Sequence, residues 1–220
     1  MYYPGDLAIS KDEIQKVSVI MEKNSILPEN TCIWKTDEQG KTVFTVLQAS
    51  SNKSAQDRQM VSMDTGLTVR LRTGNHSEEL GKICLALKES SKYAANATQK
   101  EFLSQYIESF ETGDLEVYRA SQRSWVRDVS PRVENIFGFV EPYRDPLGIR
   151  AEFEGLVAIN DPEETKLLAR LVQNSSTFIR RLPWAEGTKV NDGKGPFEKE
   201  LFEPPDFTSI HCESSSARLD

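Results

Sequence analysis

The first fifty residues change from helical to strand-like spacing of apolar positions. Apolar residues recur three or four positions apart near the start, which predicts an amphipathic helix over residues 11–24. Ser10 and Glu13 have the spacing of a capping box at the first turn of this helix. Segments 31–36 and 42–49 are rich in β-branched and aromatic residues and flank a short polar turn, so they predict a β-hairpin.

The middle of the chain is predicted to pass from a loop through one strand into helices. Residues 50–61 are small and polar, which indicates a loop, and residues 68–72 alternate like a short strand. Residues 76–127 carry apolar stripes at helical spacing. The Thr-Gly-Asp stretch at 112–114 divides this region, with Asp114 as the cap of the helix that follows.

The last third of the chain predicts two strands, one helix and then irregular sequence. Apolar stretches 136–143 and 153–159 surround a polar turn, which indicates two paired strands. A helix is predicted over 162–182, with a proline at its first position. Residues 185–206 are expected to form a connecting loop, and the polar residues 211–220 a disordered tail. These elements predict an α+β fold, with amphipathic helices on a small, partly incomplete β-sheet or barrel-like core.

Charge and composition narrow the classes of function. The 27 basic and 34 acidic residues give a net charge of −7, and no basic stripe carries interleaved aromatic residues, so nucleic-acid binding is not expected. No apolar stretch reaches the ~20 residues that a membrane span needs. The first residues lack the features of a signal peptide. The three cysteines are isolated and odd in number, which is ordinary in a reducing compartment, so a cytoplasmic location is expected.

Motifs for catalysis or metal binding are not found in the residues themselves. The two histidines, His76 and His211, stand far apart and form no His-Glu-x-x-His arrangement, and the cysteines show no C-x-x-C spacing. The sequence also lacks a phosphate loop, a dinucleotide-binding glycine pattern and a nucleophile elbow. We therefore expect no catalytic residue and no metal ligand in this chain.

Charged residues of both signs are dense between positions 134 and 154, within otherwise apolar sequence. One interpretation is an exposed strand–turn–strand carrying salt bridges, each worth about 0–1 kcal/mol. The other is the wall of a cleft. There, Glu141 and Tyr143, two positions apart on one strand face, would present a carboxylate and a phenol to a cation such as a peptide α-amino group. Composition alone favours the first interpretation.

The segment from Gly138 to Gly155 shifts the preference from the first of these interpretations to the second. It reads Gly-Phe-Val-Glu-Pro-Tyr-Arg-Asp-Pro-Leu-Gly-Ile-Arg-Ala-Glu-Phe-Glu-Gly. This segment resembles the signature G-F-[IV]-E-x-Y-R-D-P-x-G-x-R-x-E-F-E-G of the dipeptidyl peptidase III family. Flanking stretches such as Leu182-Pro183-Trp184 are also similar to the family, and the resemblance covers about residues 5–210.

The resemblance implies a two-lobed zinc peptidase that releases dipeptides from the free N-terminus of short peptides. It places residues 1–160 in a partial β-containing lobe, 161–182 in a helix that crosses to the second lobe, and 183–210 in a returning loop. It implies that Glu141 binds the peptide N-terminus. Tyr143 would form a hydrogen bond near the scissile carbonyl.

The zinc-binding stretches of that family, His-Glu-x-x-x-His and Glu-Glu-Cys-Arg-Ala-Glu, do not occur in this sequence. The resemblance therefore implies an internal fragment that carries part of the substrate cleft, binds no zinc and is inactive alone. Two alternatives stay open, a non-catalytic peptide-binding protein and a protein-interaction module. Uncovered sheet edges and apolar faces predict a poorly soluble or oligomeric chain.

Overall fold

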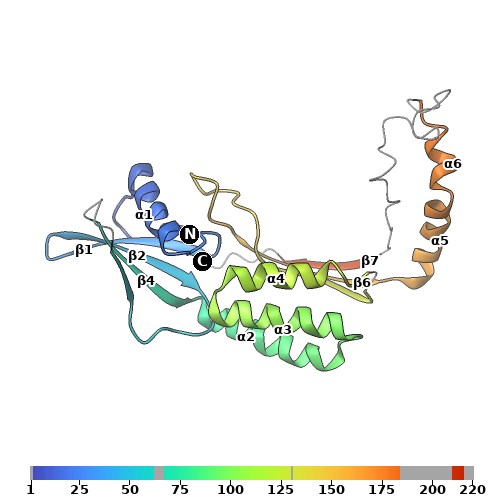
Figure 1. Ribbon diagram of the computed structural model, residues 1–220, viewed down its shortest axis with the longest axis horizontal. Coiled ribbons are helices and arrows are strands. Elements are labelled where there is room, and N and C mark those ends of the chain that lie inside the picture. Colours follow the sequence, from blue (N-terminus) through green and yellow to red (C-terminus); the bar gives the residue numbers. More distant parts are fainter. Residues whose placement is uncertain (1, 62–66, 130, 184–209, 216–220) are drawn as a thin grey trace. The chain divides into compact units, whose positions relative to one another are not determined.

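Helices and short strands are intermixed along the chain (Figure 1), which confirms the predicted α+β class. The computed structural model describes the following residues: 2–61, 67–129, 131–183 and 210–215. The chain divides into two compact units. The first comprises Met1–Val129, Ile136–Gly155 and Ser215–Asp220, and the second comprises Ser130–Asn135 and Leu156–Ser214. No helix in the described ranges is long and apolar enough to cross a membrane.

The first unit contains a four-stranded sheet with the strand order β1-β2-β4-β3. Its strands are β1 (Thr31–Glu38), β2 (Lys41–Ala49), β3 (Arg58–Val61) and β4 (Thr68–Asn75). Strands β1 and β2 are antiparallel and form the predicted hairpin, whose turn residues Gln39 and Gly40 both have positive φ. Strand β4 lies parallel to β2 and antiparallel to β3. The predicted loop over 50–61 is wrong at β3, because pairing with β4 stabilises a strand that its own polar composition does not indicate.

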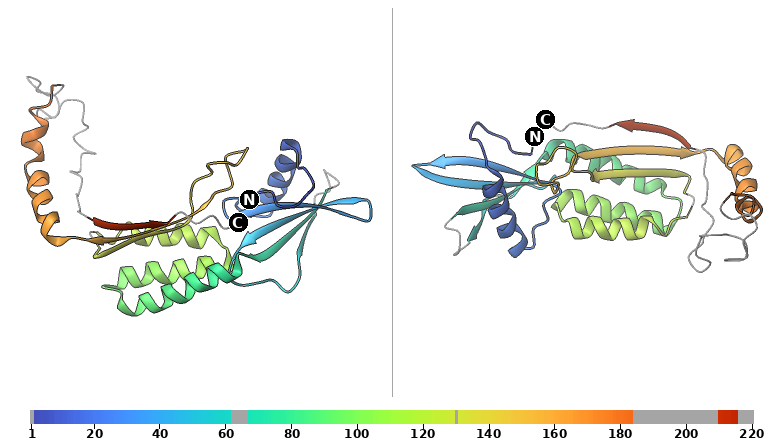
Figure 2. Two further views of the ribbon diagram at one scale, coloured as in Figure 1. Left: turned by 180° about the vertical axis from the view of Figure 1, so that it is seen from behind. Right: turned by 90° about the horizontal axis from the view of Figure 1, so that it is seen from above.

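Helix α1 (Lys11–Lys23) packs its apolar stripe against this sheet (Figure 2). The Ser10 hydroxyl accepts a hydrogen bond from the Glu13 amide at 3.2 Å, and the Glu13 carboxylate accepts one from the Ser10 amide at 2.8 Å. The predicted capping box is therefore confirmed. The residues buried in this core are Ile14, Val17, Ile20, Met21, Ile26, Ile33, Phe44, Val46, Met60, Val69 and Leu71.

Three helices of the first unit lie side by side and form its second core (Figure 1). They are α2 (Ser77–Ser90), α3 (Ala97–Thr112) and α4 (Leu115–Trp125), with a short 3₁₀ turn, η1 (Ser91–Tyr93), after α2. Gly113 ends α3 with a φ of +80°, and the Asp114 side chain accepts a hydrogen bond from the Glu116 amide at 2.8 Å. The predicted cap is confirmed, and it lets the chain reverse between two antiparallel helices.

A second sheet has the strand order β5-β6-β7. Its strands are β5 (Val133–Phe139), β6 (Phe153–Asn160) and β7 (Ile210–Ser215). The tail predicted to be disordered from residue 211 begins instead as β7, and residues 216–220 lie outside the described ranges. Ladder hydrogen bonds are made by the backbone, so an open sheet edge can pair with a segment whose polar composition does not indicate a strand.

Helix α5 (Pro162–Gln173) begins where the sequence predicts. The Asp161 carboxylate accepts hydrogen bonds from the amides of Glu163 and Glu164, and Pro162 occupies the first helical position. The predicted single helix over 162–182 is interrupted at Asn174, after which α6 (Ser175–Ile179) follows. The predicted connecting loop falls largely outside the described ranges, and the predicted domain boundaries stay predictions.

Candidate functional site

The residues singled out by the sequence lie on the loop that joins β5 to β6, residues 140–152, called here the 140–152 loop. Its two ends extend the ladder between those strands. The Val140 amide donates to the Glu152 carbonyl at 3.1 Å, and the Glu152 amide donates to the Glu141 carbonyl at 3.0 Å. The predicted strand to residue 143 is too long, because Pro142 has no amide hydrogen to continue the ladder. Glu141 and Tyr143 therefore do not share a strand face.

Glu141 and Tyr143 are both exposed, and the Tyr143 side chain is 66% accessible to solvent. A hydrogen bond with Glu154 raises the pKa of the Tyr143 hydroxyl, and the negative charges of Glu154, Glu141 and Glu152 raise it further. Three carboxylates therefore surround this phenol. The structure does bring the two predicted site residues together, although through a loop and not through a regular strand.

The three carboxylates around Tyr143 are not equivalent. The Glu152 carboxylate accepts a hydrogen bond from Arg144 Nε at 2.7 Å and another from the Tyr2 hydroxyl at 3.0 Å. Its charge is thus paired with Arg144 in a surface salt bridge of the kind that the first sequence interpretation requires. Within the described part of the chain, Glu141 forms no ion pair. Glu141 therefore presents a carboxylate that is open to a cation from solution.

A buried cluster that sequence reasoning missed holds the 140–152 loop in place. Asp145 and Arg150 are buried, and the Arg150 side chain is fully inaccessible to solvent. The Tyr3 hydroxyl donates a hydrogen bond to Asp145 Oδ1, and Arg150 Nη1 lies 3.5 Å from the Tyr3 hydroxyl oxygen. These three residues are called here the Tyr3–Asp145–Arg150 anchor. The position of Asp145 and Arg150 in the signature segment was the available signal, but dense charge in a predicted turn indicates exposure and not burial.

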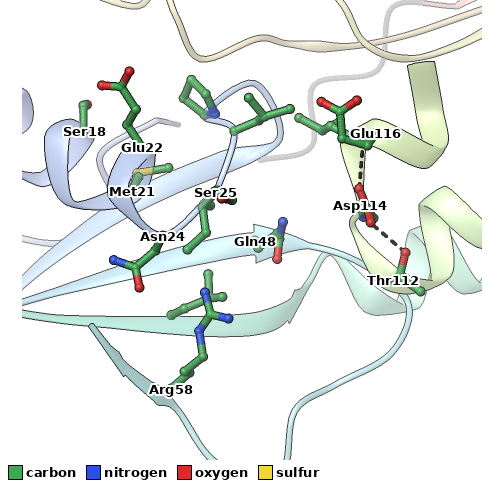
Figure 3. Close-up of a pocket in the computed structure, with 15 residues that line it drawn as sticks. Ser18, Met21, Glu22, Asn24, Ser25, Gln48, Arg58, Thr112, Asp114 and Glu116 are labelled. Carbon is green, nitrogen blue, oxygen red and sulfur yellow. Dashed lines mark hydrogen bonds between the residues drawn. The ribbon is translucent and has the colours of Figure 1, made fainter. Parts of the chain in front are cut away.

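A groove lies elsewhere in the first unit and has a volume of about 770 Å³. In Figure 3 the side chains of Gln48 and Arg58 lie between the end of α1 and the start of α4, where Asp114 and Glu116 also line the groove. Neither Glu141 nor Tyr143 contributes to it. Because its lining mixes a cation with carboxylates, the groove does not indicate one class of ligand.

The described residues do not fit a metal ion. Nowhere in the described ranges do three or more His, Cys, Asp or Glu side chains gather closely enough to hold one. Burial lowers the pKa of His76, which precedes α2 in a left-handed conformation with a φ of +54°. Burial likewise raises the pKa of the Cys32 and Cys84 thiols. These groups are therefore kept neutral by their surroundings, which suits a structural role.

A family model and individual relatives identify the same kind of protein as similar to this chain. Residues 1–215 match the model of peptidase family M49. Dipeptidyl peptidase 3 of Dictyostelium discoideum is 37% identical over 202 residues, covering 92% of this chain and 27% of that protein. Dipeptidyl peptidase 3 of Homo sapiens is 32% identical over 222 residues, covering 95% of this chain and 28% of that protein. The chain thus spans little more than a quarter of the length of these relatives.

Solved structures agree with this match at the level of the fold. The structure of dipeptidyl-peptidase III from Corallococcus sp. strain EGB superposes with a TM-score of 0.53 at 21% identity, covering 98% of this chain and 34% of that one. The structure of DPP III from Caldithrix abyssi gives a TM-score of 0.52 at 21% identity, covering 86% of this chain and 31% of that one. The described elements therefore correspond to a part of that larger fold.

Proposed function

Because the chain belongs to peptidase family M49, we propose that it supplies the part of a dipeptidyl peptidase cleft that binds the free N-terminus of short peptides. The observation that carries this proposal is the Glu141 carboxylate, which is exposed and forms no ion pair in the described part of the chain. It lies beside the Tyr143 phenol in the segment that matches the family signature. Two independent properties, sequence and electrostatics, thus point to the same pair.

The chemistry of the pair suits a peptide N-terminus. An α-amino group is a cation near neutral pH, since its ordinary pKa is about 8, and the surrounding carboxylates lower the energy of a cation at this place. The Glu154 carboxylate raises the pKa of the Tyr143 hydroxyl, which therefore keeps its proton and can donate a hydrogen bond. A carbonyl of a bound peptide would accept that hydrogen bond.

Peptide hydrolysis is assigned in this proposal to the longer proteins of the family. Zinc, expected there from the resemblance, has no set of ligands among the described residues of this chain, so no catalytic step is derived through it. The 220-residue chain is accordingly proposed to bind peptides without cleaving them. A cytoplasmic location stays a prediction.

The test compares tetra-alanine with N-acetyl-tetra-alanine, which lacks the cationic amino group. We expect the chain to bind the free peptide about fivefold more tightly, or ~1 kcal/mol, the upper end for an exposed ion pair. Glu141→Gln removes the charge and keeps the shape, so it should abolish this preference. Isothermal titration calorimetry with both peptides measures it.

The matched control is Glu22→Gln, the same substitution at an exposed residue that lines the groove of Figure 3. It should leave the preference unchanged. Equal binding of the two peptides by the wild-type chain, or loss of the preference in Glu22→Gln instead of Glu141→Gln, would remove the basis of the proposal.

A further inference from the structure

Arg150 is the largest fully buried side chain in the described part of the chain, although it carries a positive charge. Its guanidinium lies 5.6 Å from the centre of the Tyr3 ring, and Nη2 lies 3.5 Å from Met21 Sδ. Its Nε has no hydrogen-bond partner among the described residues. A buried cation that is only partly satisfied is costly to desolvate, so this arrangement is weak evidence for a gain in stability.

The same arrangement fixes the backbone of the 140–152 loop. Asp145 Oδ2 accepts hydrogen bonds from the Ile149 amide at 2.9 Å and the Arg150 amide at 3.2 Å, and the Ala151 amide donates to the Glu29 carbonyl at 2.9 Å. Two of these bonds fold the end of the loop onto its own Asp145, and the third joins Ala151 to Glu29, which lies outside the loop. The next residue, Glu152, pairs through its backbone with Glu141.

A continuous series of contacts thus runs from the buried anchor to the exposed site. The Arg150 side chain lies in the core, the backbone that follows it aligns Glu152, and Glu152 holds the Glu141 backbone from across the ladder. Arg144 and Tyr2 both donate hydrogen bonds to the Glu152 carboxylate. The position of Glu141 relative to Tyr143 depends on this series, because both side chains are exposed to solvent.

We propose that Tyr3, Asp145 and Arg150 are positioning residues that fix Glu141 and Tyr143 for binding the amino group of a peptide. This inference rests on the proposed function and adds the residues through which the site obtains its geometry. A buried ionic cluster that stabilises little can still select one loop conformation out of many. The anchor acts on the selectivity of the site and not on the survival of the fold.

The test uses Tyr3→Phe in the full 220-residue chain, with Tyr93→Phe, at an 80% exposed residue, as the matched control. Tyr3→Phe removes only the hydroxyl that joins Asp145 to Arg150. The melting temperature should fall by less than about 4 °C. Amide hydrogen exchange at Ile149 and Arg150 should become about tenfold faster. The preference for tetra-alanine over N-acetyl-tetra-alanine should fall from about fivefold towards one.

Arg150→Met is the second variant, because methionine approximates the length of the buried side chain without its charge. It should show the same faster exchange and lost preference with the fold retained. Unchanged exchange in both variants, or a wild-type preference that survives in both, overturns this inference alone. A wild-type chain that binds the two peptides equally overturns the proposed function together with it.

Discussion

Gly138 of β5 packs against the ring of Tyr118 from α4 in the second core of the first unit. A Cβ at this position would lie 2.7 Å from Tyr118 Cζ, and the backbone φ is +155°. The Tyr118 ring cannot retreat easily, because it stacks on Tyr106 at a centroid distance of 5.7 Å. Burial and then the neighbouring Tyr106 raise the pKa of the Tyr118 hydroxyl, in keeping with this enclosed position.

We therefore expect Gly138→Ala to lower the free energy of unfolding by about 1–3 kcal/mol through overpacking. Urea denaturation followed by circular dichroism measures it. Gly81→Ala is the matched control, since no atom lies within 4 Å of its Cβ position and alanine favours the α2 helix by up to ~1 kcal/mol. A Gly138→Ala variant as stable as the wild type would show that the two elements can separate at no cost.

At the scale of elements, an ion pair at the start of α1 makes the stability of the fold depend on pH. The Glu13 carboxylate pairs with Lys35 Nζ at 2.7 Å, and that hydrogen bond, followed by the one from the Ser10 amide, lowers the Glu13 pKa. A carboxylate whose pKa is lower in the folded state stabilises the fold above its ordinary pKa near 4.5. This contribution is lost as the pH falls through the lowered value.

Glu13→Gln should therefore lower the free energy of unfolding by about 0.5 kcal/mol at pH 7, because glutamine keeps the capping box but loses the ion pair. The difference from the wild type should shrink towards zero at pH 3. Chemical denaturation at the two pH values measures this difference. Glu22→Gln, the same change in the last turn of α1, should instead be neutral or slightly stabilising, since a negative charge there opposes the helix dipole. A Glu13→Gln deficit that persists at pH 3 would contradict the assignment.

Elements were predictable from the sequence where their signals are local. Helix α1 and the hairpin β1–β2 follow from periodicity, capping and a turn, all of which lie within a few residues. Strands β3 and β7 were missed because strands form through partners elsewhere in the chain, and short polar segments carry no mark of them. The same reason explains the anchor, in which Tyr3 meets Asp145 across 142 residues.

The exposed site was predictable only through the signature segment. Composition alone favoured a surface of salt bridges, and the Arg144–Glu152 pair shows that this interpretation holds for part of the loop. Asp145 and Arg150 have the same residue types as their exposed neighbours, yet they are buried. Residue type therefore does not separate exposed charges of the loop from buried ones.

At the scale of the whole molecule, α5 and α6 expose apolar side chains that a stable monomer normally covers. In the second unit, Leu167 is 66% exposed, Leu171 47% and Phe178 44%. We expect the 220-residue chain to self-associate at micromolar concentrations through these exposed apolar side chains. Leu171→Glu should weaken the association by about fivefold or more, since truncating one anchor residue in an interface costs more than ~1 kcal/mol.

Sedimentation velocity over a range of concentrations measures the association. Gln173→Glu is the matched control, because it adds the same charge to the same helix at an exposed polar position and should leave the association unchanged. A wild-type chain that sediments as a monomer at every concentration would contradict this prediction.

The long separation between Tyr3 and its partners also sets the order of events during synthesis. Tyr3 leaves the ribosome 142 residues before Asp145, an interval of roughly 10–30 s at ordinary rates of translation. Throughout that interval the place beside Met21 that Arg150 later fills has no occupant from the loop. Closing a chain segment of this length costs about 4 kcal/mol of entropy. The 140–152 loop is therefore among the last parts of the first unit to take its final shape, and a stalled chain released before residue 150 would lack the end of the loop and the buried charge of Arg150.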